Sequence, residues 1–290
     1  MKYNTILVAL CLTAYQAVAQ GGLLDELESQ PTTETIYTEA TFKGTRVVNG
    51  HSVEVRAPGV LDFMISHRFG RVNGGAYEFF GLDEANIRLG LEYGLLKGLN
   101  VGIGRSSFEK TFDGYLKYQL LRQREGAKFT PVSVVGLASI AVNSLRNTNP
   151  ERQFPFASRI DYTYQVLIAR KFNSNLSLQL APTLVHRNLV ATRAMDNNLY
   201  ALGMAGRYKL TQRVALNVEY YYRLNARTED LFYNPLAIGV DIETGGHVFQ
   251  LHFTNARAMI EEGFVTETTG NFLAGDIHFG FNVSRTFQLK

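Results

Sequence analysis

Two histidines and a serine near the C-terminus are the side chains most suited to acid–base chemistry in this chain. His252, His278 and Ser284 share one parity in two successive segments of alternating polar and apolar residues. Serine hydrolysis needs a histidine within hydrogen-bonding distance, oriented by an acid or amide. Nothing in the spacing distinguishes these three from ordinary strand residues. We therefore predict no catalytic residue and no enzyme, and keep an envelope-lipid hydrolase or acyltransferase as an alternative.

Sites for a metal ion or a phosphate group are not indicated either. The sequence has no H-E-x-x-H, C-x-x-C or EF-hand spacing, and Cys11 is its single cysteine. The G-x-G of Gly102 and Gly104 would need a following helix to bind phosphate, and strand and turn residues follow it instead. These glycines fit better as small residues facing a crowded interior. We expect no metal site and no cofactor.

The N-terminal residues resemble an export signal. Lys2 precedes an apolar core at 6–14, and Ala17-Val18-Ala19 supplies small residues for cleavage, which predicts a signal peptide over 1–19. Residues 20–58 are then an N-terminal periplasmic segment. Asn49-Gly50, between short β-prone runs, predicts a hairpin that joins, plugs or lies beneath the following domain.

The net charge of +3 is slight, and basic residues are scattered apart from Arg122, Arg124 and Lys128. A nucleic-acid partner is therefore not expected, because such surfaces concentrate positive charge.

Residues 59–290 consist of short segments in which apolar and polar residues alternate. A period of two predicts β-strands with one apolar and one polar face. About twelve such segments are present (range 10–14), and single-chain bacterial barrels need an even number. They cover residues 61–69, 87–93, 99–104, 116–120, 131–142, 160–168, 176–184, 200–208, 214–223, 236–243, 249–254 and 276–287.

The connections between these segments favour an all-β, up-and-down transmembrane barrel over a soluble β-barrel or sandwich. Short turns near 95–98, 173–175, 211–212 and 244–246 alternate with longer loops, as in outer-membrane barrels. The turn at 122–130 is a long exception. The polar face is rich in small and charged residues, which suits a wet lumen, and 276–287 is expected to pair with 61–69 and close the barrel. A short helix is expected within the last loop, at 256–262.

The alternation assigns side chains to the two faces of the barrel wall. The lumen-lining candidates are Arg88, Glu92, Lys117, Asp161, Gln165, Arg207, Glu219, Arg223, His252, His278 and Asn282. The lipid-facing candidates are Leu89, Leu91, Tyr118, Tyr164, Leu180, Leu202, Leu216, Tyr220, Phe279 and Phe281. Phe287 is the closing aromatic expected to be recognised by the barrel assembly machinery. On this assignment Phe281→Arg should be far more damaging than Asn282→Arg.

Five runs together resemble an uncharacterised outer-membrane β-barrel family of Bacteroidota. They are A-T-F-K-G-T-R-V-V-N-G-H-S-V-E (40–54), F-M-I-S-H-R-F-G (63–70), V-G-I-G-R-S-S-F-E-K-T-F-D-G-Y-L-K-Y (101–118), G-G-H-V-F-Q-L-H-F-T-N-A (245–256) and G-D-I-H-F-G-F-N-V-S-R-T-F (275–287). The resemblance spans nearly all of the chain after the export signal. It implies location in the bacterial outer membrane and a barrel architecture, but no reaction, substrate or catalytic residue.

The polar inner face suggests a narrow channel for small polar solutes. The alternative is a non-conducting barrel that is structural, or that binds a periplasmic partner through its N-terminal segment. The other expected partners are outer-membrane lipid and the barrel assembly machinery.

Overall fold

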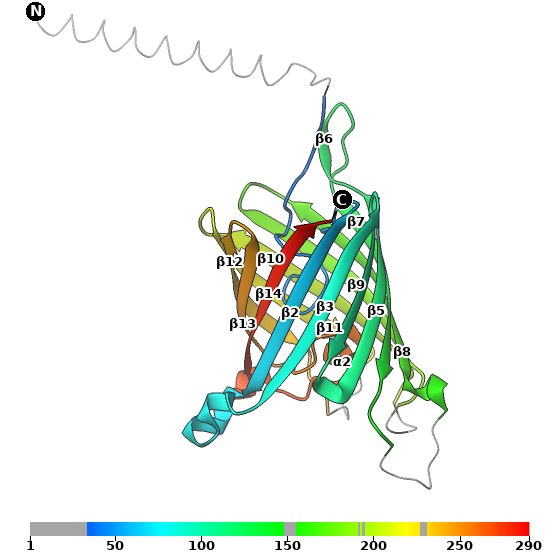
Figure 1. The fold of residues 1–290 in the computed structure, drawn as a ribbon, viewed down its shortest axis with the longest axis vertical. Helices are drawn as coiled ribbons and strands as arrows, with labels where there is room; N and C mark the ends of the chain where they lie inside the picture. The colour runs from blue at the N-terminus through cyan, green and yellow to red at the C-terminus, as the bar shows by residue number, and fades with distance from the viewer. Residues whose placement is uncertain (1–33, 148–154, 191, 193–194, 227–230, 290) are drawn as a thin grey trace, which may run out of the picture.

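The protein is a closed antiparallel β-barrel with a short two-stranded sheet beyond one of its ends (Figure 1). The computed structural model describes residues 34–147, 155–190, 192, 195–226 and 231–289. The signal peptide expected at 1–19 lies outside these residues. The barrel strands are β2 (Val60–Arg71), β3 (Ala85–Leu96), β4 (Leu99–Ser106), β5 (Thr111–Leu121), β7 (Ser133–Asn143), β8 (Ile160–Lys171), β9 (Leu176–Arg187), β10 (Asn198–Lys209), β11 (Val214–Arg223), β12 (Leu236–Thr244), β13 (His247–Thr254) and β14 (His278–Gln288).

Each barrel strand pairs with the next along the chain, and the last pairs back with the first. β14 lies antiparallel to β2, with Val283 opposite Ile65 and Phe287 opposite Leu61. Closure of this kind leaves the barrel without a free edge. The twelve-stranded barrel and its closing pair are thus confirmed.

The two faces of the wall follow the period-two pattern of the sequence. In β3, Arg88 and Glu92 are buried inside the barrel, whereas Leu89 and Leu91 are exposed outside. This arrangement is the reverse of a soluble barrel, whose apolar side chains point inward.

The two ends of the barrel differ, and we call them the terminal end and the loop end. The terminal end carries the C-terminus, β1 and the short turns at 97–98, 172–175, 210–213 and 245–246 (Figure 1). The loop end carries the longer connections, with η1 (Val72–Gly81), η2 (Phe108–Lys110), η3 (Phe156–Arg159), α2 (Glu261–Thr266) and η4 (Phe272–Ala274). Among the described residues, no helix is both long enough and apolar enough to cross a membrane.

The long turn at 122–130 has a structural reason. Its strand β6 (Arg124–Gly126) pairs with β1 (Thr35–Tyr37), Ile36 lying opposite Glu125. Backbone hydrogen bonds between Arg124 and Thr130 hold the turn as a hairpin. The turn thus extends beyond the barrel and holds the chain that leads into it.

The helix of the last loop begins five residues later than expected, because the chain before it is held extended. The side chain of Asn255 binds the backbone of Leu236, Asn234 and Gly270. The Ala256 N–H donates to the Thr254 hydroxyl. These contacts hold the chain at the wall, and only after Ile260, which is itself extended, does α2 begin.

Candidate functional site

The barrel interior contains the N-terminal segment of the chain. Residues 41–53, which we call the plug, enter from the terminal end and reverse direction between Arg46 and His51. Backbone bonds from Val47 N to Gly50 O and from Ser52 N to Thr45 O close this hairpin. The hairpin expected around Asn49-Gly50 therefore lies inside the barrel.

Glu219 of β11 holds the tip of the plug. Its carboxylate accepts backbone N–H groups from Val48 at 3.2 Å, Asn49 at 3.2 Å and Gly50 at 3.0 Å. A Cβ atom on Gly50 would lie 2.1 Å from the Tyr221 hydroxyl oxygen, so a larger residue at the tip would have to displace the buried Tyr221 side chain. Hydrogen bonds from N–H groups to an ionised carboxylate are stronger than those between neutral groups, so these three bonds hold the plug tip firmly to β11.

Other wall side chains bind the plug backbone in the same manner. Gln179 accepts from Val53 N and donates to His51 O, each within 2.9 Å. Gln250 donates to Val47 O at 2.8 Å and Asn282 to Val48 O at 2.9 Å. Polar residues on the inner face therefore satisfy backbone groups that burial would otherwise leave unpaired.

The plug also buries apolar side chains against small ones of the wall. Phe42, Val47, Val48 and Val53 of the plug form one cluster with Val135, Leu167, Ala169, Ala181 and Ala237. Sequence reasoning missed this cluster, although the segment at 131–142, apolar on both faces, was a signal for it. Valine and leucine at inward positions would be unfavourable in a lumen filled with water.

A second segment enters from the loop end. Phe264 and Val265 of α2 are buried with Ala256 and Ala258 against wall residues that include Val185, Ala201 and Tyr221. We call residues 255–268 the inner loop.

The plug and the inner loop meet inside the barrel. Arg46 Nη1 lies 3.1 Å from Glu261 Oε1, and these side chains are only 4% and 3% exposed. Tyr221 touches both segments, because its ring lies 5.1 Å from that of Phe264 and its hydroxyl faces Gly50. Together they form a partition across the barrel.

Open space lies on either side of this partition. At the terminal end, two large hollows that open to solvent flank the chain where it enters. At the loop end, two much smaller hollows, each with room for only a few water molecules, lie beside α2. The described residues thus give a vestibule at each end and packed protein between them.

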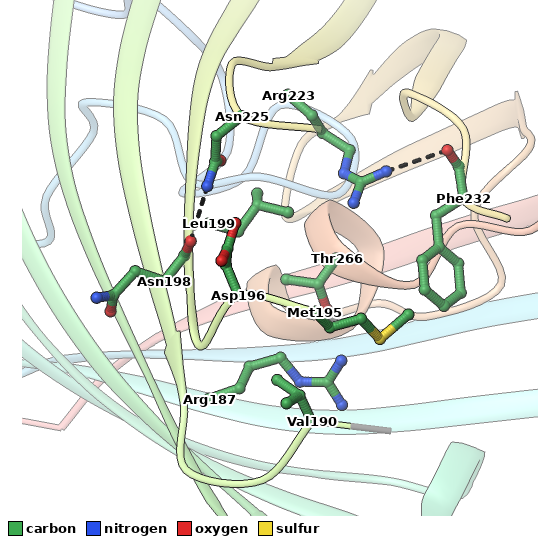
Figure 2. Close-up of a pocket in the computed structure, with 10 residues that line it drawn as sticks. All are labelled: Arg187, Val190, Met195, Asp196, Asn198, Leu199, Arg223, Asn225, Phe232 and Thr266. Carbon is green, nitrogen blue, oxygen red and sulfur yellow. Dashed lines mark hydrogen bonds between the residues drawn. The ribbon is translucent and has the colours of Figure 1, made fainter. Parts of the chain in front are cut away.

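The first loop-end hollow, which we call the loop-end pocket, is lined by charged, amide and apolar groups (Figure 2). Arg187 of β9 and Arg223 of β11 lie on either side of Thr266 from α2. Arg223 Nη1 donates to Phe232 O at 3.0 Å, and Arg187 Nη2 lies 2.6 Å from Glu267 Oε1. The other lining residues are Val190, Met195, Asp196, Asn198, Leu199 and Asn225.

The second loop-end hollow is acidic, with Glu109, Asp161, Glu262 and Glu267 in its lining. Burial raises the pKa of Glu262 well above its usual range, and the nearby carboxylates of Asp113 and Glu261 raise it further. Burial and then Glu267 raise the pKa of Glu109. Arg187 belongs to both hollows and pairs with Glu267, so it separates the acidic hollow from the loop-end pocket.

The structure buries most side chains assigned to the lumen. Those buried are Arg88, Glu92, Lys117, Gln165, Arg207, Glu219, Arg223, His252, His278 and Asn282, and Asp161 is partly exposed at the loop end. Glu219, Lys117 and Asn282 contact the plug, Lys117 through Thr45 O, and Lys117 also donates to the O of Glu54, the residue after the plug. The others are spread along the wall rather than gathered in one site.

The side chains assigned to lipid lie on the opposite face. Leu89, Leu91, Tyr118, Tyr164, Leu180 and Leu216 are exposed, whereas Leu202, Tyr220, Phe279 and Phe281 are partly covered by outward neighbours. Phe287 is exposed near the end of β14.

The catalytic arrangement considered for β14 is not assembled. His278 and Ser284 lie six residues apart on one strand, which corresponds to roughly 20 Å. His278 Nδ1 is instead 2.9 Å from Phe69 O. Among the residues that the structure describes, no cluster of three or more histidine, aspartate or glutamate side chains could hold a metal ion.

Comparison with known proteins places residues 42–287 within one family model, described as "Membrane bound beta barrel domain (DUF5777)". No curated protein matches the chain in sequence. Similar solved structures include the NanC porin, with 9% identity and a TM-score of 0.48, and the KdgM porin, with 10% and 0.46; each match covers 79% of this chain and 99% of the other. Outer membrane phospholipase A from Escherichia coli is similar at 13% identity and a TM-score of 0.45, over 79% of this chain and 97% of that one.

Proposed function

This chain belongs to the family of membrane-bound β-barrel domains, and on that premise we propose that it is an outer-membrane channel for small polar solutes, closed in this conformation by its plug. The observation that carries the proposal is the partition between two vestibules. Its plug is anchored through backbone hydrogen bonds to the single carboxylate of Glu219.

The number of strands favours a channel over a barrel whose interior is filled by the side chains of its own wall. Eight strands enclose an interior that wall side chains can fill, and sixteen leave an aqueous pore. Twelve strands leave room that the plug and the inner loop occupy here. Withdrawal of the plug would uncover polar wall groups such as Gln179, Gln250 and Asn282, which suit the passage of a hydrated solute.

The asymmetry of the two ends supports an orientation. In outer-membrane barrels the short turns face the periplasm and the long loops face outward. The terminal end, with the entry of the plug, would then be periplasmic, and the outward apolar side chains would contact lipid. A periplasmic entry places the plug where a force or partner in that compartment can reach it. The proposal includes no catalytic step.

Conductance in planar bilayers tests this function. The wild-type protein should open rarely, because its plug is bound. Glu219→Ala removes the acceptor of three plug N–H groups and should produce frequent, discrete openings. Asp113→Asn is the matched control, since Asp113 is also a buried wall carboxylate but pairs with Arg88 of the wall. It should behave as wild type.

A barrel that folds but carries no current would contradict this function. Heat-modifiable migration in gel electrophoresis verifies that each variant forms a barrel. If Glu219→Ala migrates as a folded barrel and carries no current, the channel function is wrong.

A non-conducting, partner-binding barrel is the second candidate, and one observation favours it. The β1–β6 sheet extends beyond the terminal end and exposes the apolar side chains of Ile36, Tyr37 and Phe129. Crosslinking from these positions in native membranes should capture one reproducible periplasmic protein if this candidate holds. Absence of such a product, together with openings in Glu219→Ala, would exclude it.

A further inference from the structure

A shallow groove crosses the outward face of the wall over β4, β5, β7 and β8, and we call it the wall groove. The small residues Gly114 and Ala138 leave its space, and Leu116, Ile140 and Tyr164 stand around them. These three larger side chains are exposed, and the lining of the groove is almost entirely apolar. Large apolar side chains fill most other outward positions, so β5 and β7 leave a hollow in a surface that is otherwise bulky.

An outward arginine lies next to the wall groove, at the loop end of β4. Ile103 is opposite Gly114, and Arg105 follows two residues later on the same face of the strand. Diagonal neighbours of this kind lie roughly 7–8 Å apart, so the Arg105 side chain can reach the groove. Its guanidinium lies 5.3 Å from the centre of the Phe112 ring, and it forms no ion pair with any residue that the structure describes.

The spacing along the wall fits the dimensions of one membrane leaflet. If the outward face contacts lipid, an arginine on that face has to reach the headgroups. Phe112 is opposite Arg105, and Leu116 beside the groove lies four residues further along β5, roughly 13 Å away. The hydrocarbon of one leaflet is about 15 Å thick. The wall groove would therefore lie in the leaflet at the loop end, with Arg105 at the level of its headgroups.

We propose that Arg105 and the wall groove bind a lipid that carries a phosphate group, with the phosphate on the guanidinium and an acyl chain in the groove. Guanidinium groups bind phosphate through paired N–H donors. The acyl chain contacts the apolar side chains around Gly114 and Ala138. This site goes beyond the channel function and requires only that the outward face contacts lipid.

Charge complementarity favours a lipid over a second copy of this chain. All twelve barrel strands are described, and their alternation places every aspartate and glutamate within them on the inward face. A second copy that docked through its own outward wall would therefore offer no carboxylate to Arg105. A phosphorylated lipid supplies the anion and the apolar chain in one molecule.

A tryptophan reporter tests this site, because the chain has no tryptophan of its own. Tyr164→Trp places the reporter at the wall groove, and Tyr222→Trp on β11 is the matched control, since each tyrosine is 50% exposed. The quenchers are a phosphatidic acid and a diacylglycerol with the same brominated acyl chains, added to the full chain in detergent.

The phosphate should determine quenching only at the groove. Phosphatidic acid should half-quench Tyr164→Trp at a concentration about tenfold lower than diacylglycerol does, as expected for one charge-assisted hydrogen bond. The two lipids should quench Tyr222→Trp alike. Heat-modifiable migration verifies that each variant forms a barrel.

Variants of the Tyr164→Trp chain separate the two parts of the site. Arg105→Gln should remove the preference for phosphatidic acid, and Arg105→Lys should retain part of it, because lysine binds phosphate as a point charge. Arg285→Gln should retain all of it, since Arg285 also stacks on a phenylalanine, at 4.9 Å from the Phe287 ring, but near the terminal end of β14. Ala138→Leu fills the groove and should weaken quenching by both lipids.

Several results would overturn the site. These are equal half-quenching concentrations of the two lipids at Tyr164→Trp, the same preference at Tyr222→Trp, and a preference that survives Arg105→Gln. Unchanged quenching in Ala138→Leu would overturn the placement of the acyl chain. Protection of Tyr164→Trp from both lipids, with sedimentation as a dimer, would assign the groove to a second copy instead. None of these measurements uses conductance, so failure of the channel function and failure of this inference are distinguishable.

Discussion

At the scale of single residues, apolar side chains that face outward alternate along each strand with polar or small side chains that face inward. Phe281 points outward near the middle of β14, where its ring stacks on that of His67 at 4.9 Å. If this face contacts lipid, Phe281→Arg should lower the free energy of unfolding by roughly 2–4 kcal/mol. Phe281→Leu should cost far less. Equilibrium unfolding in phospholipid vesicles measures both, and equal effects of the two variants would contradict a lipid-facing position.

The structure changes the expectation for the next residue. Asn282 is not in open water, because its amide donates to Val48 O of the plug and to Gln250 Oε1. An arginine there would have to displace the plug tip. We therefore expect Asn282→Arg to cost about 1–3 kcal/mol through overpacking and lost hydrogen bonds, rather than to be mild. The same vesicle titration compares it with Phe281→Arg.

The sequence predicts which face of the wall a residue lies on, but it does not predict which residues that side chain contacts. Alternation alone places Arg88 and Glu219 on the inner face, since the period of a strand is two. The sequence does not show that Glu219 binds Gly50, 169 positions away in the chain. Contacts of this separation depend on closure of the whole barrel, which no local pattern encodes.

At the scale of elements, adjacent strands adjust side-chain size to fit the crowded interior. Gly102 of β4 faces inward, and a Cβ atom there would lie 2.0 Å from the Tyr115 ring, whose hydroxyl donates to Glu92. Gly114 of β5 faces outward, with its nearest neighbour at an ordinary 3.7 Å.

These two glycines give a matched prediction. Gly102→Ala should destabilise the barrel by about 1–3 kcal/mol, because the buried ring must move, whereas Gly114→Ala should be nearly neutral. The midpoint of urea unfolding, followed by tyrosine fluorescence, compares them. A neutral Gly102→Ala would mean that Tyr115 relaxes freely and that the interior is loosely packed at this point.

Elements with regular periodicity were predicted well, and those without it were not. All twelve strands occur where alternation places them, because pairing and burial reinforce the same pattern. α2 begins later than the sequence suggested, since side-chain bonds from Asn255 hold the chain extended before it. The pairing of β1 with β6 was not predicted, because each is three residues long and too short for a detectable period.

At the scale of the whole molecule, the wall of the barrel and the plug inside it are held by different interactions. The wall is continuous through paired strands from β2 to β14. The plug is joined to it covalently beyond residue 53, and otherwise through hydrogen bonds, one apolar cluster and an ion pair between Lys43 and Glu243 of β12. If the plug is the gate of the proposed channel, its withdrawal would break these contacts and leave the strand pairing of the wall intact.

A crosslink between plug and wall tests this whole-molecule motion. Asn49 Nδ2 lies 3.5 Å from Thr254 Oγ1 of β13, so Asn49→Cys and Thr254→Cys are within reach of a short bifunctional thiosulfonate. In the Glu219→Ala background, with Cys11 replaced by serine, this link should abolish the openings, and a reductant should restore them. A link between Ser139→Cys and Thr163→Cys, register partners on β7 and β8, joins only wall strands and should leave the openings intact. Openings that persist with the plug linked to Thr254 would show that solute passes without movement of the plug tip, and the gate would then have to be sought in the inner loop.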